Sequence, residues 1–192
     1  MRYLNGTKEF GILFKKCSST EFRLSGFTDS DFASCFTRKS RTGYIFFVGG
    51  CIVSWSSKKK NVIALSTCEA EFYALTEGGK ESIHLNRLMW EFVNQSPISD
   101  SSSLQAVDLF CDNQSTIFVS KNPAEFKTMK HIDLRQKWIQ EKVENGDFKV
   151  HYVSTKNQLA DILTKPLPKE LFEKLREECG IVRQPFRLAR EC

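Results

Sequence analysis

Four acidic residues in four separate segments carry the side chains best suited to hold a cation. Asp29 and Asp112 follow short runs of strand-forming residues, whereas Glu71 and Asp161 lie in predicted helices. In a sheet covered by helices, strand ends and the facing turn of a helix can meet at one place. Carboxylates about 4 Å apart repel one another by roughly 1–4 kcal/mol at effective dielectric constants of 80 to 20, so such a group requires cations.

Each of these carboxylates also has an ordinary structural explanation, and spacing alone leaves the choice open. Asp29 and Asp31 suit a turn, Asp112 suits a helix N-cap, and acidic side chains on helices are commonly solvated. Asp29 and Asp31 are two residues apart, so a continued strand would present both on one face. Glu69 and Glu71 are about 200° apart on a helix, so only one of them can easily reach the site. Periodicity does not decide between the members of either pair.

The elements that must position these residues follow from hydrophobic periodicity, capping patterns and turn residues. The chain begins with an all-β block from about 21 to 57, which contains a first strand into Asp29 and a hairpin over 41–55 that turns at Gly49-Gly50. A helix then runs from the N-cap Ser66 to about Val93. The remaining predicted elements are a strand over 106–111, helices over 114–120 and 128–144, a strand over 148–153, a helix after a capping box at 155–158, and a helix over 169–179. This order predicts an α/β fold with a mixed sheet and helices on its faces.

Several stretches carry further expectations. The basic stretch 56–60 is interpreted as a loop, and 181–192 as a loose tail. Gly78-Gly79 costs roughly 2 kcal/mol relative to two alanines, so we expect a kink, a close helix contact or a break there. In the 128–144 helix, the basic residues, Arg135 among them, are predicted to face outward.

Composition limits the class of protein. At 192 residues, with 41% hydrophobic and 27% charged residues, the chain is expected to form one globular domain with an extension. A formal charge of +5 is compatible with a polyanionic partner without establishing one. The seven cysteines include no C-x-x-C pair, which argues against a zinc site and favours reduced thiols. Neither a signal peptide nor a membrane-spanning run is present, so we expect a soluble, intracellular protein without a membrane partner.

The motifs resemble, in order and spacing, the ribonuclease H domain of copia-type LTR-retrotransposon Pol polyproteins. The resemblance extends from about residue 2 to residue 180, and the segment Arg2–Thr7 looks like the junction from a preceding reverse transcriptase. The segments that carry it are Thr28–Ala33, Arg38–Tyr44, Ser54–Lys59, Ser66–Leu75, Cys111–Ser115, Lys130–Arg135 and Gln158–Leu167. Phe32, Ser34 and Gly78-Gly79 depart from the family pattern, and none of them belongs to the acidic set.

The resemblance implies a ribonuclease H-like α/β fold. Its five-stranded mixed sheet has three antiparallel strands followed by two parallel ones, and helices flank it. The implied division is a connection from the reverse transcriptase over 1–20, the ribonuclease H domain over 21–168, and a C-terminal helix and tail over 169–192. The family's acidic set falls on Asp29, Glu71, Asp112 and Asp161 as catalytic metal ligands, and the family pattern thereby favours Asp29 over Asp31 and Glu71 over Glu69.

The implied activity is hydrolysis of the RNA strand of an RNA–DNA hybrid during reverse transcription, in the cytoplasm or within virus-like particles. Oxygen ligands suit two Mg²⁺ ions, with Mn²⁺ as a plausible substitute, and such a pair would activate water and stabilise the leaving oxygen. The implied partners are the hybrid and the reverse transcriptase of the same polyprotein. The candidate hybrid contacts are Asn113, Gln114, Lys130, His131 and Arg135, with Lys58–Lys60 and Lys127 as further basic candidates and a solvated helix face as the alternative.

Two other functions fit parts of the pattern. One is a catalytically weak or inactive nucleic-acid-binding remnant of a retrotransposon polyprotein, which the intact carboxylate set argues against. The other is a different nuclease or an integrase of the same fold, which the copia-like segments after Asp112 argue against.

Overall fold

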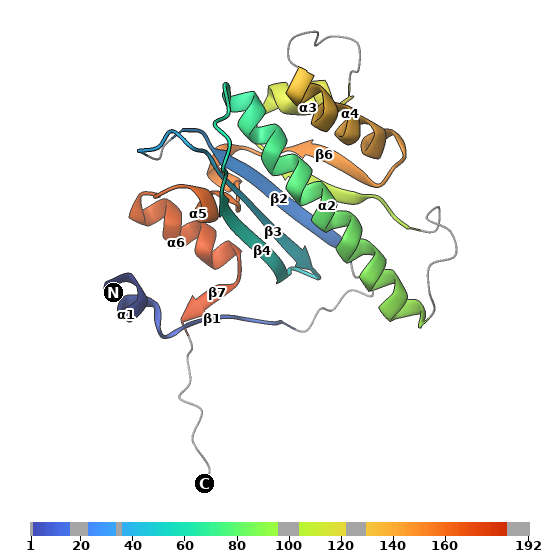
Figure 1. Cartoon of the computed structure of the whole chain (residues 1–192). Helices are drawn as coiled ribbons and strands as arrows, with labels where there is room; N and C mark the ends of the chain where they lie inside the picture. The colour runs from blue at the N-terminus through green and yellow to red at the C-terminus, as the bar shows by residue number, and fades with distance from the viewer. Residues whose placement is uncertain (1, 16–22, 34–35, 96–103, 122–129, 184–192) are drawn as a thin grey trace.

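The fold is organised around one five-stranded mixed sheet (Figure 1). The structure is a computed structural model that describes residues 2–15, 23–33, 36–95, 104–121 and 130–183, with only the backbone described for 2–4 and 130–133. The strands of the sheet are β2 (Leu24–Asp31), β3 (Arg41–Val48), β4 (Cys51–Lys59), β5 (Val107–Cys111) and β6 (Phe148–Tyr152). Their spatial order is β4-β3-β2-β5-β6. The first three strands are antiparallel, and β5 and β6 run parallel to β2, which confirms the predicted fold class.

Helices cover both faces of the sheet. They are α2 (Thr67–Asn94), α3 (Gln114–Lys121), α4 (Lys130–Glu144), α5 (Asp161–Thr164) and α6 (Lys169–Glu178), whereas α1 (Arg2–Thr7) lies at the N-terminal end of the chain. On one face α2, α3 and α4 enclose a core that includes Phe46, whereas on the other α5 and α6 enclose a core that includes Ile45 and Phe47. This alternation is the period of two expected of a strand with both faces buried. None of the helices in the described ranges has both the length and the apolar composition to cross a membrane.

The predicted hairpin turn at Gly49-Gly50 and the predicted N-cap at Ser66 are confirmed. Gly49 and Gly50 join β3 to β4 with φ of 56° and 78°, the left-handed backbone that favours glycine in tight hairpins. Ser66 is the N-cap of α2, where its hydroxyl oxygen accepts from the amide of Glu69 at 3.1 Å.

The glycine pair in α2 marks a close contact in an unbroken helix. A Cβ added at Gly78 would lie 2.4 Å from Cγ2 of Thr28 on β2, and one at Gly79 would lie 2.9 Å from Cε1 of Phe148 on β6. α2 runs without interruption from Thr67 to Asn94, so a close contact was the correct alternative among those expected. The helix tolerates two poor helix formers because they allow it to lie directly on the sheet.

Three expectations about secondary structure are wrong. Residues 56–59 are part of β4, since Ser56 and Lys59 pair with Tyr44 and Arg41 of β3, so only Lys60 lies outside the strand. The stretch after β6 forms a 3₁₀ turn, Thr155–Asn157, and the four-residue α5, and the expected capping box does not form.

The expected tail also contains a strand. Residues Ile181–Arg183 form β7, which pairs antiparallel with β1 (Phe10–Ile12). The pairing ties the end of α6 to the N-terminal segment, a long-range contact that local periodicity does not signal. Residues 184–192, and the serine-rich residues 96–103 that the sequence suggests as a connector, lie outside the described residues.

Gly78→Ala is expected to destabilise the fold. Overpacking a core typically costs about 1–3 kcal/mol, which exceeds the gain of up to about 1 kcal/mol in helix propensity. Denaturant unfolding measures the difference. Gly6→Ala is the matched control, because an added Cβ at Gly6 meets nothing within 4 Å. Equal stability of Gly78→Ala and the unmodified chain would contradict the close contact.

Candidate carboxylate active site

Strand β2 delivers Asp29 into the interior. Its side chain is fully buried, and each oxygen has a partner: Oδ2 accepts from the hydroxyl of Thr164, and Oδ1 accepts from Nζ of Lys165 at 3.1 Å. Asp31 lies two residues further, at the end of β2 opposite Arg41, and belongs to neither of the close acidic groups described below. The structure therefore assigns Asp29, and not Asp31, to the acidic site, a choice that the two-residue period of a strand leaves open.

The first turns of α2 separate Glu69 from Glu71. Glu69 accepts from the backbone amide of Leu65 at 2.6 Å and from the hydroxyl of Tyr73 at 3.3 Å, so it stabilises the start of the helix. Glu71 points to the sheet, where its Oε1 accepts from the amide of Ser30 at 3.3 Å. Only Glu71 reaches the other carboxylates.

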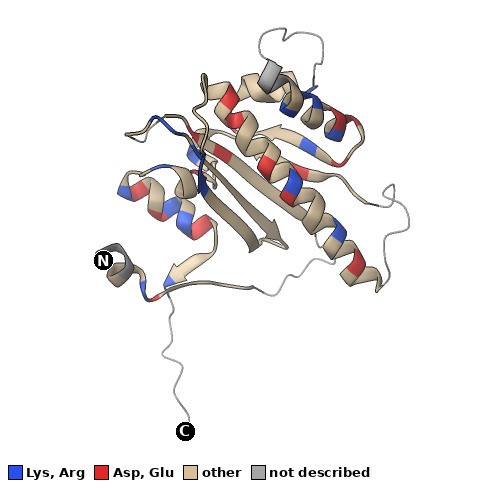
Figure 2. Cartoon of the chain, in the orientation of Figure 1, with Lys and Arg blue, Asp and Glu red and all other residues tan. Residues whose placement is uncertain are grey.

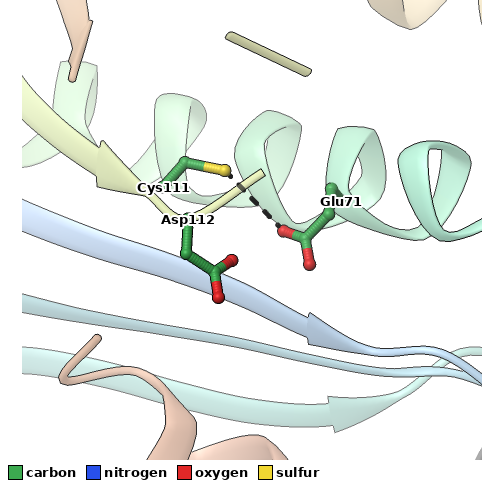
Figure 3. Close-up of side chains that lie close together, drawn as sticks. All are labelled: Glu71, Cys111 and Asp112. Atoms are coloured by element: carbon green, nitrogen blue, oxygen red, sulfur yellow. Dashed lines mark hydrogen bonds between the residues drawn. The ribbon is translucent and has the colours of Figure 1, made fainter. Parts of the chain in front are cut away.

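Asp112 follows the end of β5 and lies next to Glu71 (Figure 3). The register pairs Phe27 with Phe110, and its continuation by two residues brings Asp112 level with Asp29. Asp112 does not cap α3. Asn113 does so instead, because its side-chain oxygen accepts from the amide of Thr116 at 2.9 Å. Asp112 is thus left to the site.

Helix α5 brings Asp161 from the opposite face of the sheet. A Cβ at Gly43 would lie 2.7 Å from Cγ2 of Thr164, so the glycine lets α5 pack directly on β3. Gln158, fully buried, donates to the carbonyl of Thr28 at 3.0 Å and thereby fixes the segment that leads into α5. These contacts place Asp161 beside Asp29.

The four carboxylates converge in two groups that share Asp112. Ligand atoms of Asp29, Asp112 and Asp161 all lie within 4.8 Å of one another, and so do those of Glu71, Cys111 and Asp112. The thiol of Cys111 donates to Oε2 of Glu71 at 3.8 Å (Figure 3). Such a spacing allows oxygens from different residues to share one cation.

Burial and mutual repulsion shift the acidity of the site. Burial, with repulsion from Asp29 and Asp112, raises the pKa of Glu71 well above its usual range. Burial also raises the pKa of Asp29, against the attraction of Lys165. Burial and the charge of Asp29 raise the pKa of Asp161 to about 7. Burial lowers the pKa of Lys165, but the carboxylates of Asp29 and Asp161 outweigh it, so the net shift is upward.

Three residues at the site were not singled out from the sequence. Lys165 donates to both Asp29 and Asp161, and its place four residues after Asp161 is a spacing that indicates such a pair. Thr164 donates to Asp29, and the hydroxyl of Thr155 donates to Oδ2 of Asp112 at 2.9 Å. No local sequence signal announces the two threonine contacts, since each joins elements distant along the chain.

The basic candidates for substrate contact differ in how they are held. The guanidinium of Arg135 lies 4.3 Å from the ring centroid of Tyr73, so this side chain packs on α2 and does not project freely outward as predicted. Lys60 pairs with Glu77 at 3.4 Å. Gln114 is exposed at the start of α3. The side chains of Lys130 and His131, and the whole of Lys127, lie outside the described residues.

Relatives of the chain are transposon polyproteins. It is 40% identical over 182 residues to "Retrovirus-related Pol polyprotein from transposon TNT 1-94" of Nicotiana tabacum, a match covering 94% of this chain and 13% of the relative. It is 32% identical over 189 residues to "Retrovirus-related Pol polyprotein from transposon RE2" of Arabidopsis thaliana, covering 96% and 12%. The chain is therefore similar, over nearly all of its length, to one segment of transposon Pol polyproteins. It spans about an eighth of the length of these relatives. No protein-family model matches it.

Solved structures show which fold this chain has. "Crystal structure of LC11-RNase H1 in complex with RNA/DNA hybrid" superposes with a TM-score of 0.51 at 12% identity, covering 79% of this chain and 98% of that one. "Structure of the foamy viral protease-reverse transcriptase in complex with RNA/DNA hybrid" superposes with a TM-score of 0.53 at 16% identity, covering 80% and 21%. The fold of this chain is therefore that of ribonuclease H, and the resemblance inferred from the sequence is confirmed.

The metal-free domain is expected to lose stability as the pH rises from about 4 to 7. Asp161 has a raised pKa in the folded state, so over this range the folded chain binds more protons than the unfolded chain, and the free energy of unfolding falls. Asp161→Asn should reduce this fall by an amount on the order of 2 kcal/mol. Denaturant unfolding in EDTA across the range measures it. The exposed Glu170 provides the control Glu170→Gln, and an unchanged slope in Asp161→Asn would contradict the assignment.

Proposed function

We propose that this Pol domain is a metal-dependent endonuclease that hydrolyses the RNA strand of RNA–DNA hybrids, a ribonuclease H of a copia-type element. The observation that carries the proposal is the convergence of Asp29, Glu71, Asp112 and Asp161 in two groups that share Asp112. They come from two strand ends and from helices on opposite faces of a ribonuclease H fold. Burying several like charges side by side destabilises a fold, and catalysis is the role that accounts for this cost in stability.

The ligand atoms present fit hard divalent cations. The group of Asp29, Asp112 and Asp161 offers only carboxylate oxygens, which suit Mg²⁺ or Mn²⁺. The second group shares Asp112 and adds Glu71, an arrangement that favours two adjacent ions. When bound, such ions supply Lewis-acid activation of water and charge stabilisation at the reacting phosphate.

The chain's own residues hold the acidic side chains in place. Thr164 fixes Asp29, Thr155 fixes Asp112, and the amide of Ser30 holds Glu71. These bonds keep each carboxylate in one orientation, which lowers the reorganisation needed when charge develops at the phosphate. Hydroxyl donors at the metal ligands commonly have this positioning role.

A basic strand end supports hybrid binding at the same end of the sheet. Asp29 pairs with Gly43, and Gly43 with Ser57, so Lys58 and Lys59 follow directly beyond the acidic site. Figure 2 shows basic residues where β4 ends close to α5. We assign phosphate contacts to this strand end, with Asn113, Gln114, Lys130, His131 and Arg135 as the contacts proposed on the helix side.

The biological setting follows from the family. We assign the domain to reverse transcription, where it acts with the reverse transcriptase of the same polyprotein, in the cytoplasm or in virus-like particles. Residues 1–20 would connect the two, 21–168 would form the ribonuclease H domain, and 169–192 would form a C-terminal extension that contains α6 and β7. Two solved structures with this fold, one of them a viral protease-reverse transcriptase, are described as complexes with RNA/DNA hybrid.

A cleavage assay tests the activity. With Mg²⁺ or Mn²⁺, the chain should cut the RNA of a labelled hybrid and leave RNA duplex and DNA duplex intact, and EDTA should abolish cutting. Asp112→Asn should lower the rate about 10²–10³-fold, the typical loss of a positioned electrostatic group. Asp108→Asn is the matched control, because Asp108 lies four residues earlier on β5 and pairs with His151. Its rate should stay within a few-fold of the unmodified chain.

Hybrid binding without cleavage in either metal would overturn the enzyme assignment and favour a nucleic-acid-binding remnant. Cleavage of DNA duplex in preference to the hybrid would favour a different nuclease of this fold. Equal losses in Asp112→Asn and Asp108→Asn would contradict the assignment of the site to these carboxylates.

A further inference from the structure

Lys165 sits among the carboxylates that the proposed metal ions would need. Its Nζ donates to Oδ1 of Asp161 at 2.9 Å and to Oδ1 of Asp29 at 3.1 Å. The two aspartate side chains are 2% and 0% exposed, whereas that of Lys165 is 28% exposed. The ammonium group therefore enters the buried site from its solvent side, and its single positive charge is shared between the two aspartates.

The fold places Lys165 there by local means. It is the C-cap of α5, four residues after Asp161, and its amide donates to the carbonyl of Asp161 at 3.0 Å. Pro166 follows it, and a residue before proline is driven to extended backbone, which Lys165 adopts with φ of −124° and ψ of 148°. Helix α5 thus ends so that the lysine and the aspartate of one short segment meet.

Each oxygen of Asp29 already accepts a hydrogen bond in the metal-free chain. Its Oδ2 accepts from the hydroxyl of Thr164, and Lys165 donates to the remaining Oδ1. Mg²⁺ binds carboxylate oxygens at about 2.0–2.1 Å, closer than the ammonium lies, and a doubly charged ion at this oxygen would repel the ammonium strongly. Both cations cannot share Asp29 favourably.

We propose that Lys165 is an internal counter-ion that competes with the divalent cation for Asp29 and Asp161. In the metal-free chain it offsets the repulsion among the buried carboxylates, so the domain folds without metal. When metal binds, the ammonium leaves these oxygens, and the cost of its displacement weakens metal affinity. The inference rests on the proposed metal-dependent function of the same carboxylates and adds a residue that sets the metal concentration that the site requires.

Lys165→Met separates this role from a purely structural one. The variant removes the charge and keeps much of the side-chain volume, and Lys169→Met is the control with the same charge change at an exposed position. Two measurements at pH 7.5 are needed: calorimetric titration with Mn²⁺ and with Mg²⁺, and thermal unfolding in EDTA. We expect about tenfold tighter Mn²⁺ binding by Lys165→Met, equivalent to about 1.4 kcal/mol, together with a lower unfolding temperature in EDTA. Lys169→Met should match the unmodified chain in both measurements.

Each outcome decides the matter. Tighter metal binding with lower metal-free stability in Lys165→Met alone supports competition, as does metal binding by Lys165→Met where the unmodified chain binds none. Equal or weaker metal binding by Lys165→Met, with normal binding by the unmodified chain, overturns the counter-ion role and leaves the proposed function standing. Tightening of equal size in Lys169→Met overturns it too, because the effect would then be one of net charge. Failure of both chains to bind either metal overturns the competition and the metal dependence together.

Discussion

Repulsion among buried carboxylates is the constraint on which the rest of the structure depends. Asp29, Glu71 and Asp161 are all at least nine-tenths buried, and their charged forms oppose one another. Such a group persists only where the fold forces the side chains together and something offsets the charge. In this domain the compensation comes from backbone and hydroxyl donors and from the ammonium of Lys165. The same electrostatics that destabilise the site would favour a bound cation.

The topology of the sheet brings the residues of the site together. Parallel pairing of β2 with β5 brings two strand ends to one edge, which places Asp29 level with Asp112. Glycines then let helices approach from both faces, with Gly78 of α2 against Thr28, and Gly43 of β3 against Thr164 of α5. The acidic site therefore depends on positions without side chains as much as on the acids themselves.

The domain's relation to Pol polyproteins gives this architecture a context. Its homologues are transposon Pol polyproteins, and it spans about an eighth of their length. Its fold is shared with ribonucleases H. The acidic set inferred from sequence motifs is the set that converges in space. This agreement between relatives and geometry supports the proposed function, metal and partners. The position of Lys165 within the site is a feature that the fold alone does not imply.

The sequence by itself determined the fold class, the hairpin at Gly49-Gly50, the N-cap at Ser66 and the four acidic positions, because these are signalled by local periodicity, turn chemistry or motif. It did not determine whether Gly78-Gly79 would break the helix or allow it to pack closely on the sheet. Nor did it determine that residues 56–59 would extend a strand, that 181–183 would pair with β1, or that Lys165 would lie between two aspartates. Those outcomes depend on partners far away along the chain, whose distances and charges exist only once the sheet has brought them together.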